Sequence, residues 1–380
     1  MTRAVQSRAS WLVPCALVGA LLTALPQGAR GADDAREWLE KMNKALATRN
    51  YDGTFLHISG GRVETMRIVH RVRSGRVSER LQSLDGSRRE FVRANDELTC
   101  YLPDQHTVLV EPRQDRGPFL GSLPQFDLSV GEFYRIESLP STHILGRPAR
   151  VIAVYPKDQF RFGYRLWLDE KTAMPLKTQL CDPQGQVIEQ LFFARLDMPE
   201  NIPDSDLAPT VRTVGMRWVR QGPSNDSASA ALADYRASQL PPGFRLTVQG
   251  AQTLGGASAP ASHLVYSDGL ATVSVFVEEQ RGSVPGVAMF GATAPGVGTT
   301  GNAIQGDSIT GVANVAASSV SLEPDAQAPV QGLARVGSGY AFSTVVQGHQ
   351  VTAVGEVPAQ TVEFIAHSVK NYGGAEIPRH

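Results

Sequence analysis

The sequence has few cysteines, and their number excludes a disulfide-rich scaffold. Of the three cysteines in the 380 residues, Cys15 lies in an apolar N-terminal run, which leaves Cys100 and Cys181. These two are far apart in the sequence without paired histidines near them, which argues against a structural zinc site. In an exported protein they can form a disulfide or stay free, because the distance between their Cα atoms depends on the strand register. The sequence leaves both alternatives open.

The sequence also lacks the motifs of common catalytic sites. It contains no G-x-S-x-G, H-E-x-x-H or H-x-H pattern, so the usual hydrolase and metalloprotease geometries are not predicted. Residues 296–301 (GVGTTG) match the dinucleotide fingerprint formally, but no buried strand pattern precedes them and no helix pattern follows. We therefore expect a binding protein and not an enzyme, with no catalytic residues, no cofactor and no metal ion.

Long hydrophobic runs are scarce. The longest, residues 11–25 (WLVPCALVGALLTAL), follows Arg3 and Arg8 and precedes the small-residue stretch Ala29-Arg30-Gly31. This order is typical of a secretion signal, and we predict a cleaved signal peptide over residues 1–31. A transmembrane anchor is the alternative, but the run is shorter than the roughly 20 residues that a span needs. We expect the mature chain to be soluble.

Charge of one sign is not in excess, which argues against a nucleic-acid partner. The formal net charge is −1, and it becomes −4 when the signal peptide leaves with three arginines and no acidic residue. About 350 residues then remain, which is more than a single hydrophobic core usually organises, so two domains are expected.

The first predicted domain, residues 32–200, reads as a long antiparallel meander. Its strand-like runs end at tight-turn residues, namely Gly60-Gly61, Ser74-Gly75, Asp85-Gly86, Asn95-Asp96 and Asp182-Pro183-Gln184-Gly185. The predicted strands cover residues 53–59, 62–72, 76–84, 88–93, 97–102, 107–111, 133–136, 150–155 and 160–168.

A helix is predicted to precede the meander and to pack against it. Asp33 or Asp34 can cap this helix, and its apolar residues recur at helical spacing. These apolar residues are Trp38, Leu39, Met42, Ala45 and Leu46.

The second half of the chain predicts a linker and a smaller domain. Residues 201–230 are rich in Pro, Asn, Asp and Ser and are interpreted as an interdomain linker. Residues 231–372 predict a small α+β domain with strands at 264–266, 271–278 and 350–355 and a helix at 359–369. Residues 282–330, mostly Gly, Ala, Ser, Thr and Val, predict a flexible insertion. The fold class expected for the whole chain is α+β, mainly β.

Five short motifs occur in order along the chain, and each alone is a turn-and-strand pattern. They are residues 84–90 (LDGSRRE), 168–176 (LDEKTAMPL) with 186–190 (QVIEQ), 240–244 (LPPGF), 266–270 (YSDGL) and 354–358 (VGEVP). Together they resemble the RseB/MucB-type periplasmic regulators of the envelope-stress sigma factor. The resemblance implies a large unclosed antiparallel β-barrel with a helical plug, similar to lipoprotein carriers, followed by a smaller partner-binding domain.

The resemblance also implies a function. Such proteins are periplasmic and bind the periplasmic part of a membrane-embedded anti-sigma factor, which they protect from regulated proteolysis. Lipid or lipopolysaccharide acyl chains are implied to weaken this hold and start the stress response. A periplasmic lipid or lipoprotein carrier is the alternative, and the second domain favours the regulator because a simple carrier needs only the barrel. Whether the chain forms homo-oligomers stays open.

Candidate site residues follow from the alternation of residues along the predicted strand 160–168, which places apolar side chains on one face, and from the five motifs. Acyl contact is expected on apolar large-domain residues, which could equally be ordinary core: Phe133, Phe160, Phe162, Tyr164 and Leu166. Partner contact is expected on residues of the small-domain motifs, some of which a turn or a strand end also needs: Tyr266, Asp268, Gly269, Gly355 and Glu356.

Overall fold

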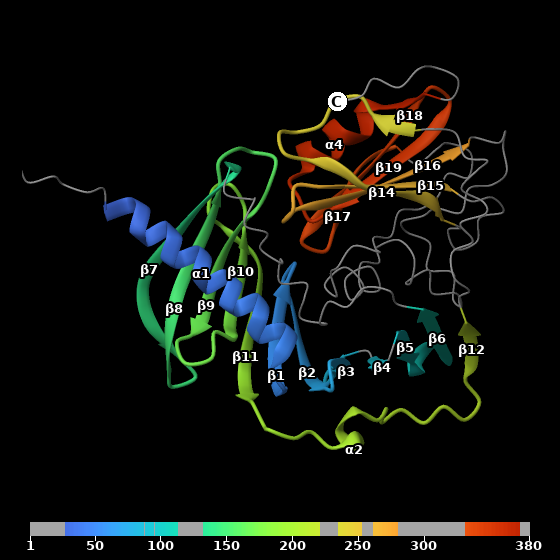
Figure 1. Cartoon of the computed structure of the whole chain (residues 1–380). Coiled ribbons are helices and arrows are strands. Elements are labelled where there is room, and N and C mark those ends of the chain that lie inside the picture. The colour runs from blue at the N-terminus through green and yellow to red at the C-terminus, as the bar shows by residue number, and fades with distance from the viewer. Residues whose placement is uncertain are drawn as a thin grey trace, which may run out of the picture.

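The computed structural model describes residues 27–86, 88–94, 96–112, 132–220, 235–252, 261–279 and 331–372, and two large sheets organise them (Figure 1). The predicted insertion at 282–330 and most of the predicted signal peptide lie outside these residues. Strands dominate, and the larger sheet is not closed, which confirms the α+β, mainly β class. No helix in the described ranges is both long and apolar enough to span a bilayer.

The larger sheet has 12 strands in the order β12-β6-β5-β4-β3-β2-β1-β11-β10-β9-β8-β7. Neighbours are antiparallel except β12 and β6, which run parallel. Gly60 and Gly61 have φ of 57° and 79°, so this turn lies where the glycine pair predicted it. The strands are β1 Tyr51–Ser59, β2 Arg62–Arg73, β3 Arg76–Ser83, β4 Glu90–Ala94, β5 Glu97–Leu102, β6 Thr107–Pro112, β7 Tyr134–Ile144, β8 Arg147–Pro156, β9 Gly163–Asp169, β10 Pro175–Cys181, β11 Val187–Asp197 and β12 Arg217–Arg220.

Helix α1 (Gln27–Thr48) crosses the inner face of this sheet, over β7 to β11 and β1 (Figure 1). The predicted start at Asp33 or Asp34 is wrong, because the helix begins at Gln27. The Asp34 carboxylate instead accepts hydrogen bonds from Ser138 of β7 and Arg150 of β8. Its buried apolar side chains join the core of the large domain, as the helical spacing predicted: Ala35, Leu39, Met42, Ala45 and Leu46.

The first part of the predicted linker packs on the large sheet as an outer strap, residues 201–216. It contains helix α2 (Asp204–Leu207), and Ile202 and Leu207 bury Val69 of β2. Thr210 donates to Glu90 Oε2 through both its backbone nitrogen and its hydroxyl, at 2.9 and 3.0 Å. The strap leads into β12, so residues 201–220 complete the outer side of the large domain.

The small domain has a six-stranded antiparallel sheet with helix α4 (Ala359–Ser368) on one face (Figure 1). Val362, Ile365 and Ala366 of α4 are fully buried against the sheet, as the helical spacing predicted. A two-stranded sheet, β13 (Tyr235–Ala237) with β20 (Val369–Asn371), joins the ends of this domain. The six strands are β14 Arg245–Gln252, β15 Ala261–Ser267, β16 Thr272–Glu279, β19 His349–Gly355, β18 Gly339–Val346 and β17 Gly332–Val336.

Cys100 and Cys181 are both buried, and neither forms a disulfide. Cys100 lies in β5 and Cys181 ends β10, and five strands separate β5 from β10 in the sheet. The structure therefore does not contain the Cys100–Cys181 disulfide that the sequence left open. Burial raises the pKa of the Cys181 thiol, so it is less easily ionised than an exposed cysteine.

Candidate functional site at the domain seam

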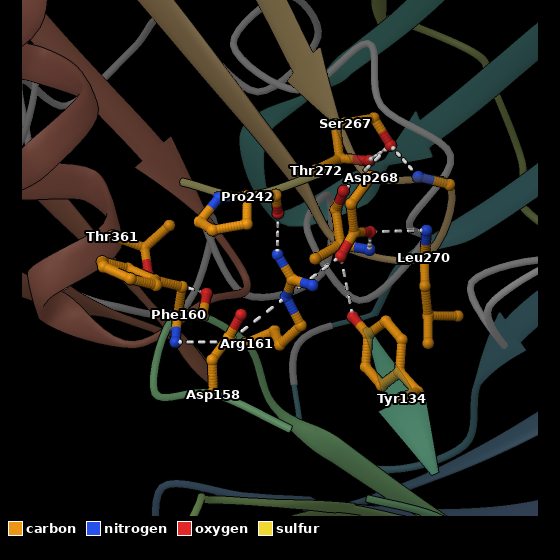
Figure 2. Close-up of polar contacts among 12 residues, drawn as sticks. Tyr134, Asp158, Phe160, Arg161, Pro242, Ser267, Asp268, Leu270, Thr272 and Thr361 are labelled. Carbon is orange, nitrogen blue, oxygen red and sulfur yellow. Dashed lines mark hydrogen bonds and ion pairs between the residues drawn. The ribbon is translucent and has the colours of Figure 1, made fainter. Parts of the chain in front are cut away.

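Arg161 joins the two domains. Its side chain is 0% exposed, and Figure 2 shows it between the large domain and the small one. Its Nε lies 3.3 Å from Asp268 Oδ2 and 3.5 Å from Asp158 Oδ1, and its Nη2 donates to the carbonyl oxygen of Pro242. The guanidinium carbon also lies about 5 Å from three aromatic rings, which provide cation–π contacts: Phe133 at 4.8 Å, Phe244 at 5.3 Å and Tyr134 at 5.5 Å.

Asp268, the ion-pair partner of Arg161, lies in a tight turn between β15 and β16. Its Oδ1 accepts hydrogen bonds from the backbone nitrogens of Leu270 and Ala271, at 2.8 and 2.7 Å. Its Oδ2 accepts a hydrogen bond from the Tyr134 hydroxyl at 3.0 Å (Figure 2). Burial, followed by the charge of Asp268, raises the pKa of Tyr134 well above its usual range, so the phenol stays a donor. The turn thus fixes a carboxylate that faces the large domain.

The N-terminal end of α4 makes a second contact with the loop between β8 and β9. Thr361 Oγ1 donates to the carbonyl oxygen of Phe160 at 2.7 Å, and Gln360 donates to that of Gln159. The Phe160 ring meets Phe364 edge to face, with centroids 5.7 Å apart. We call the contacts of Phe133, Tyr134 and residues 157–162 with the small domain the seam.

The residues 240–244 (LPPGF) need their glycine at the seam. Gly243 has a φ of +81°, and a Cβ on it would come within 2.3 Å of the Phe133 ring. Glycine alone among the common residues meets both demands without strain. Pro242 and Phe244, on either side, both contact Arg161.

A group of titratable side chains from both domains lies near the seam. His57 Nε2 is 3.1 Å from Glu189 Oε1, and its Nδ1 is 4.0 Å from Glu64 Oε2. Burial alone would lower the pKa of His57, but attraction to the carboxylates of Glu189 and then Glu64 outweighs it and raises this pKa to about 9. In the small domain, burial and then the charge of Glu189 raise the pKa of Glu356 to about 8. Ser338 donates a hydrogen bond to Glu356.

The predicted acyl-contact residues do not share one face. The prediction of a strand from Phe160 is wrong, because β9 begins at Gly163 and the preceding residues bend to meet the small domain. Phe133 and Phe160 lie at the seam, as described above. Phe162 and Leu166 are buried, and Tyr164 is partly buried and packs against the core of the large domain.

The predicted partner-contact residues make contacts within the chain. The Tyr266 hydroxyl accepts a hydrogen bond from the backbone nitrogen of Ala237 at 2.7 Å, and its ring is buried. A Cβ on Gly355 would come within 2.5 Å of the Thr272 carbonyl oxygen. Asp268 and Gly269 form the turn that faces Arg161, and Gly269 has a φ of +96°. Glu356 is half-buried.

Sequence reasoning missed Arg161 and Tyr134 as residues of the site. The predicted strand 160–168 includes Arg161, whereas the strand in the structure begins only at Gly163. The signal that could have found it lies in two of the motifs, because residues 240–244 and 266–270 both contribute atoms that face its guanidinium. In the described part of the chain, no cluster of His, Cys, Asp and Glu could hold a metal ion.

Comparison with family models matches both domains. The model described as MucB/RseB N-terminal domain matches residues 34–211, and the MucB/RseB C-terminal domain model matches residues 229–305 and 307–370. The Pseudomonas aeruginosa protein named sigma factor AlgU regulatory protein MucB is 34% identical over 274 residues, covering 72% of this chain and 82% of that protein. The Escherichia coli K12 protein named sigma-E factor regulatory protein RseB is 24% identical and covers 96% of this chain and 99% of its own length. Both relatives carry the name of a regulatory protein.

Solved structures agree with these matches. MucB in the Pseudomonas aeruginosa MucA/MucB complex is 27% identical, with a TM-score of 0.62 over 89% of this chain and 99% of that chain. MucB in complex with MucA(peri) gives a TM-score of 0.60 at the same identity and coverage. The likeness extends over both domains.

Proposed function

Because the chain belongs to the MucB/RseB family, we propose that it is a periplasmic regulatory protein that binds the periplasmic part of a membrane-embedded anti-sigma factor. One observation carries the proposal: both domains match a MucB that was solved together with its partner MucA. By covering the anti-sigma factor, the protein protects it from regulated proteolysis and so acts as a negative regulator of the envelope stress response.

The seam gives this binding a physical basis. If the partner contacts both domains, it binds more tightly when the domains already have a fixed relative orientation, because ordering two loosely connected domains costs binding free energy. Arg161 supports that orientation, because it is fully buried, forms an ion pair with Asp268 and donates a hydrogen bond to the Pro242 carbonyl oxygen, both in the small domain. On this view Asp268 and Gly269 act on the partner through the orientation of the domains and not by direct contact.

Lipid sensing is the finer part of the proposal. In the described chain no helix covers the inner face of β2 to β6, beside α1 (Figure 1). Cross-strand pairing lines up an apolar row there, whose side chains are at most 7% exposed, so an acyl chain reaches them only by displacing the groups that now cover them: Ile68, Leu81, Phe91, Cys100 and Leu109. An acyl chain that favours the partner-free state must weaken partner binding by the same factor by which the partner weakens acyl binding.

The test is a binding titration with the exported chain and the periplasmic segment of the anti-sigma factor from the same organism. We expect a one-to-one complex whose affinity falls when lipopolysaccharide is added. A Leu81→Gln variant should lose the lipid effect, because a polar amide in the apolar row opposes acyl contact. Since Leu81 is a core residue only 1% exposed, thermal unfolding must show that the variant still folds before its partner and lipid affinities are compared. Val63→Gln, on the opposite side of the sheet and 54% exposed, is the matched control.

Two results would overturn parts of this proposal separately. No complex with the anti-sigma segment would overturn the regulator. If the chain instead copurifies from the cell envelope with lipids or lipoproteins and with no anti-sigma factor, the alternative, a periplasmic carrier, is favoured. A complex that forms but ignores lipid would leave the regulator intact and remove lipid sensing.

A further inference from the structure

The outer face of the large sheet, opposite α1, carries a continuous row of apolar and cationic side chains. Cross-strand pairs place Leu56 beside Phe192, Phe192 beside Lys177, Lys177 beside Trp167, and Trp167 beside Val151. Residues directly opposite on neighbouring strands have side chains in contact distance on the same face. The row therefore crosses five adjacent strands without interruption, from β1 to β8.

A second row beside it adds polar and cationic groups. Ile58 pairs with Gln190, Gln190 with Gln179, and Gln179 with Arg165, and the two glutamine side chains are hydrogen-bonded at 2.7 Å. Val63, which pairs with Ile58, is 54% exposed. We call Leu56, Ile58, Arg165, Trp167, Lys177 and Phe192 the outer patch.

The outer patch lacks the cover that the neighbouring half of the sheet has. The outer strap packs on β2, β3 and β4, where it buries Val69 and bonds to Glu90. No helix or strand of the described chain packs extensively over the outer patch, and its side chains are only partly buried, although Trp167 also packs against the large-domain core. None of its apolar side chains is fully exposed, but together they form a contiguous apolar surface, which on a monomer marks an interaction site.

The charge of the outer patch is positive and not neutralised within the described residues. Lys177 Nζ lies 4.6 Å from the centre of the Trp167 ring, and Arg165 lies in the neighbouring row. Neither cation has a carboxylate within ion-pair distance in the described part of the chain, while nearby Arg67 and Arg195 do. A counter-charge for these two cations must therefore come from outside the described residues.

The geometry narrows what can supply that counter-charge. Strands β1, β11, β10 and β9 are paired on both sides, so no edge is free here for an added peptide strand. A second copy would bring the same cations face to face across a two-fold interface, which is unfavourable. The outer side of a curved sheet also forms no groove for a buried chain, whereas it can touch a flat surface.

We propose that the outer patch is a membrane-contact surface that rests on anionic phospholipid headgroups. A tryptophan flanked by Lys and Arg is the composition found where proteins meet the membrane interface. The cations pair with lipid phosphates, and Trp167, Phe192 and Leu56 lie against the headgroup layer. This contact goes beyond partner binding and does not require it.

The test is sedimentation of the exported chain with vesicles. The protein is expected to bind vesicles of phosphatidylcholine with one third phosphatidylglycerol, and to stay in solution with phosphatidylcholine alone. An Arg165→Gln/Lys177→Gln variant should bind the anionic vesicles about 30-fold more weakly, since each cation near an anionic surface contributes roughly a factor of five. Binding should also fall as salt is added, because ions screen exposed charges.

The control variant is Arg212→Gln/Arg217→Gln, which removes two exposed cations of the strap and β12 and should bind as the original chain does. Thermal unfolding of each variant separates loss of binding from loss of fold. Equal binding to both kinds of vesicle, or no loss in the patch variant, would overturn the proposal. Weaker anti-sigma binding with unchanged vesicle binding would assign the outer patch to the partner and overturn the membrane contact.

Discussion

The large sheet and the seam both bury charged side chains, but the two clusters hold different parts together. In the sheet, Glu79 of β3 lies 2.6 Å from His70 of β2 and 3.3 Å from Arg93 of β4, and all three are almost fully buried. At the seam, Arg161 and Asp268 come from different domains. Neighbouring strands cannot separate without unfolding, whereas domains can separate with their cores intact. The same chemistry therefore supports stability in one place and domain orientation in the other.

The largest effect is expected from breaking the sheet cluster. Glu79→Ala leaves His70 and Arg93 buried without their carboxylate, and removal of one partner of a buried ion pair is strongly destabilising. We expect the free energy of unfolding of the large domain to fall by about 5 kcal/mol. Urea denaturation measures this loss. Glu137→Ala, at an exposed ion pair, should change it by less than about 1 kcal/mol, and equal losses in both variants would contradict the comparison.

Breaking the seam cluster should act on orientation more than on the cores. Arg161→Ala leaves Asp268 and Tyr134 buried with fewer partners, so docking of the domains should weaken by about 4 kcal/mol. We expect faster proteolysis between the domains, a larger radius in small-angle scattering and weaker anti-sigma binding. The unfolding free energy of each core should hardly change.

The conservative variant sharpens this prediction. Lysine has a single ammonium group and cannot reach Asp268 and Pro242 at once or lie flat between three rings as the guanidinium does. Arg161→Lys should therefore resemble Arg161→Ala in scattering and proteolysis. If Arg161→Lys matched the original chain in scattering and proteolysis, the guanidinium would not be needed for domain orientation. If it lost as much core stability as Glu79→Ala, the seam arginine would support the cores and not only the orientation of the domains.

The pH dependence of stability should distinguish the titratable groups beside the seam. The folded-state pKa of His57, about 9, lies above its unfolded value near 6.5, so its contribution is complete below about pH 6.5 and is lost as the pH rises through 9. The loss is on the order of 3 kcal/mol at most. The raised pKa of Glu356, about 8, also lowers stability as the pH rises, but only from about pH 4.5 to 8.

His57→Gln is the variant that tests this assignment. Above pH 8 the original chain should still lose stability, because Glu356 is then already ionised and His57 is not yet neutral. In His57→Gln this part of the loss should disappear. Denaturant unfolding between pH 7 and 10 measures both chains, and parallel curves would mean that His57 is not the group responsible.

The elements that sequence predicted well depend on local patterns. The β1–β2 turn follows from Gly60-Gly61, and the buried face of α4 follows from the spacing of Val362, Ile365 and Ala366. Each of these signals lies within a few residues, where periodicity and turn chemistry act directly.

The elements that sequence missed depend on distant partners. Ile202 and Leu207 are isolated apolar residues in a Pro- and Asp-rich stretch, and their partner Val69 lies far away in the chain. Because these two residues pack on Val69, residues 201–216 lie against the large sheet as a strap, although the sequence predicted a linker there. Arg161 was missed in the same way, because its partners Pro242 and Asp268 belong to another domain and no local pattern reports a contact over that separation.

The smallest effect is expected at the α4 contact of the seam. Thr361→Val keeps the shape of the side chain but removes the hydroxyl that donates to the Phe160 carbonyl oxygen. Because the backbone acceptor stays unpaired at the seam, docking of the domains should weaken by about 1 kcal/mol, roughly a quarter of the Arg161→Ala effect. Partner affinity, measured by titration calorimetry, should fall less than tenfold. Ser368→Ala, which changes hydrogen bonds inside the small domain alone, is the control and should leave that affinity unchanged. An effect of Thr361→Val as large as that of Arg161→Ala would mean that α4, and not the buried arginine, sets the orientation of the two domains.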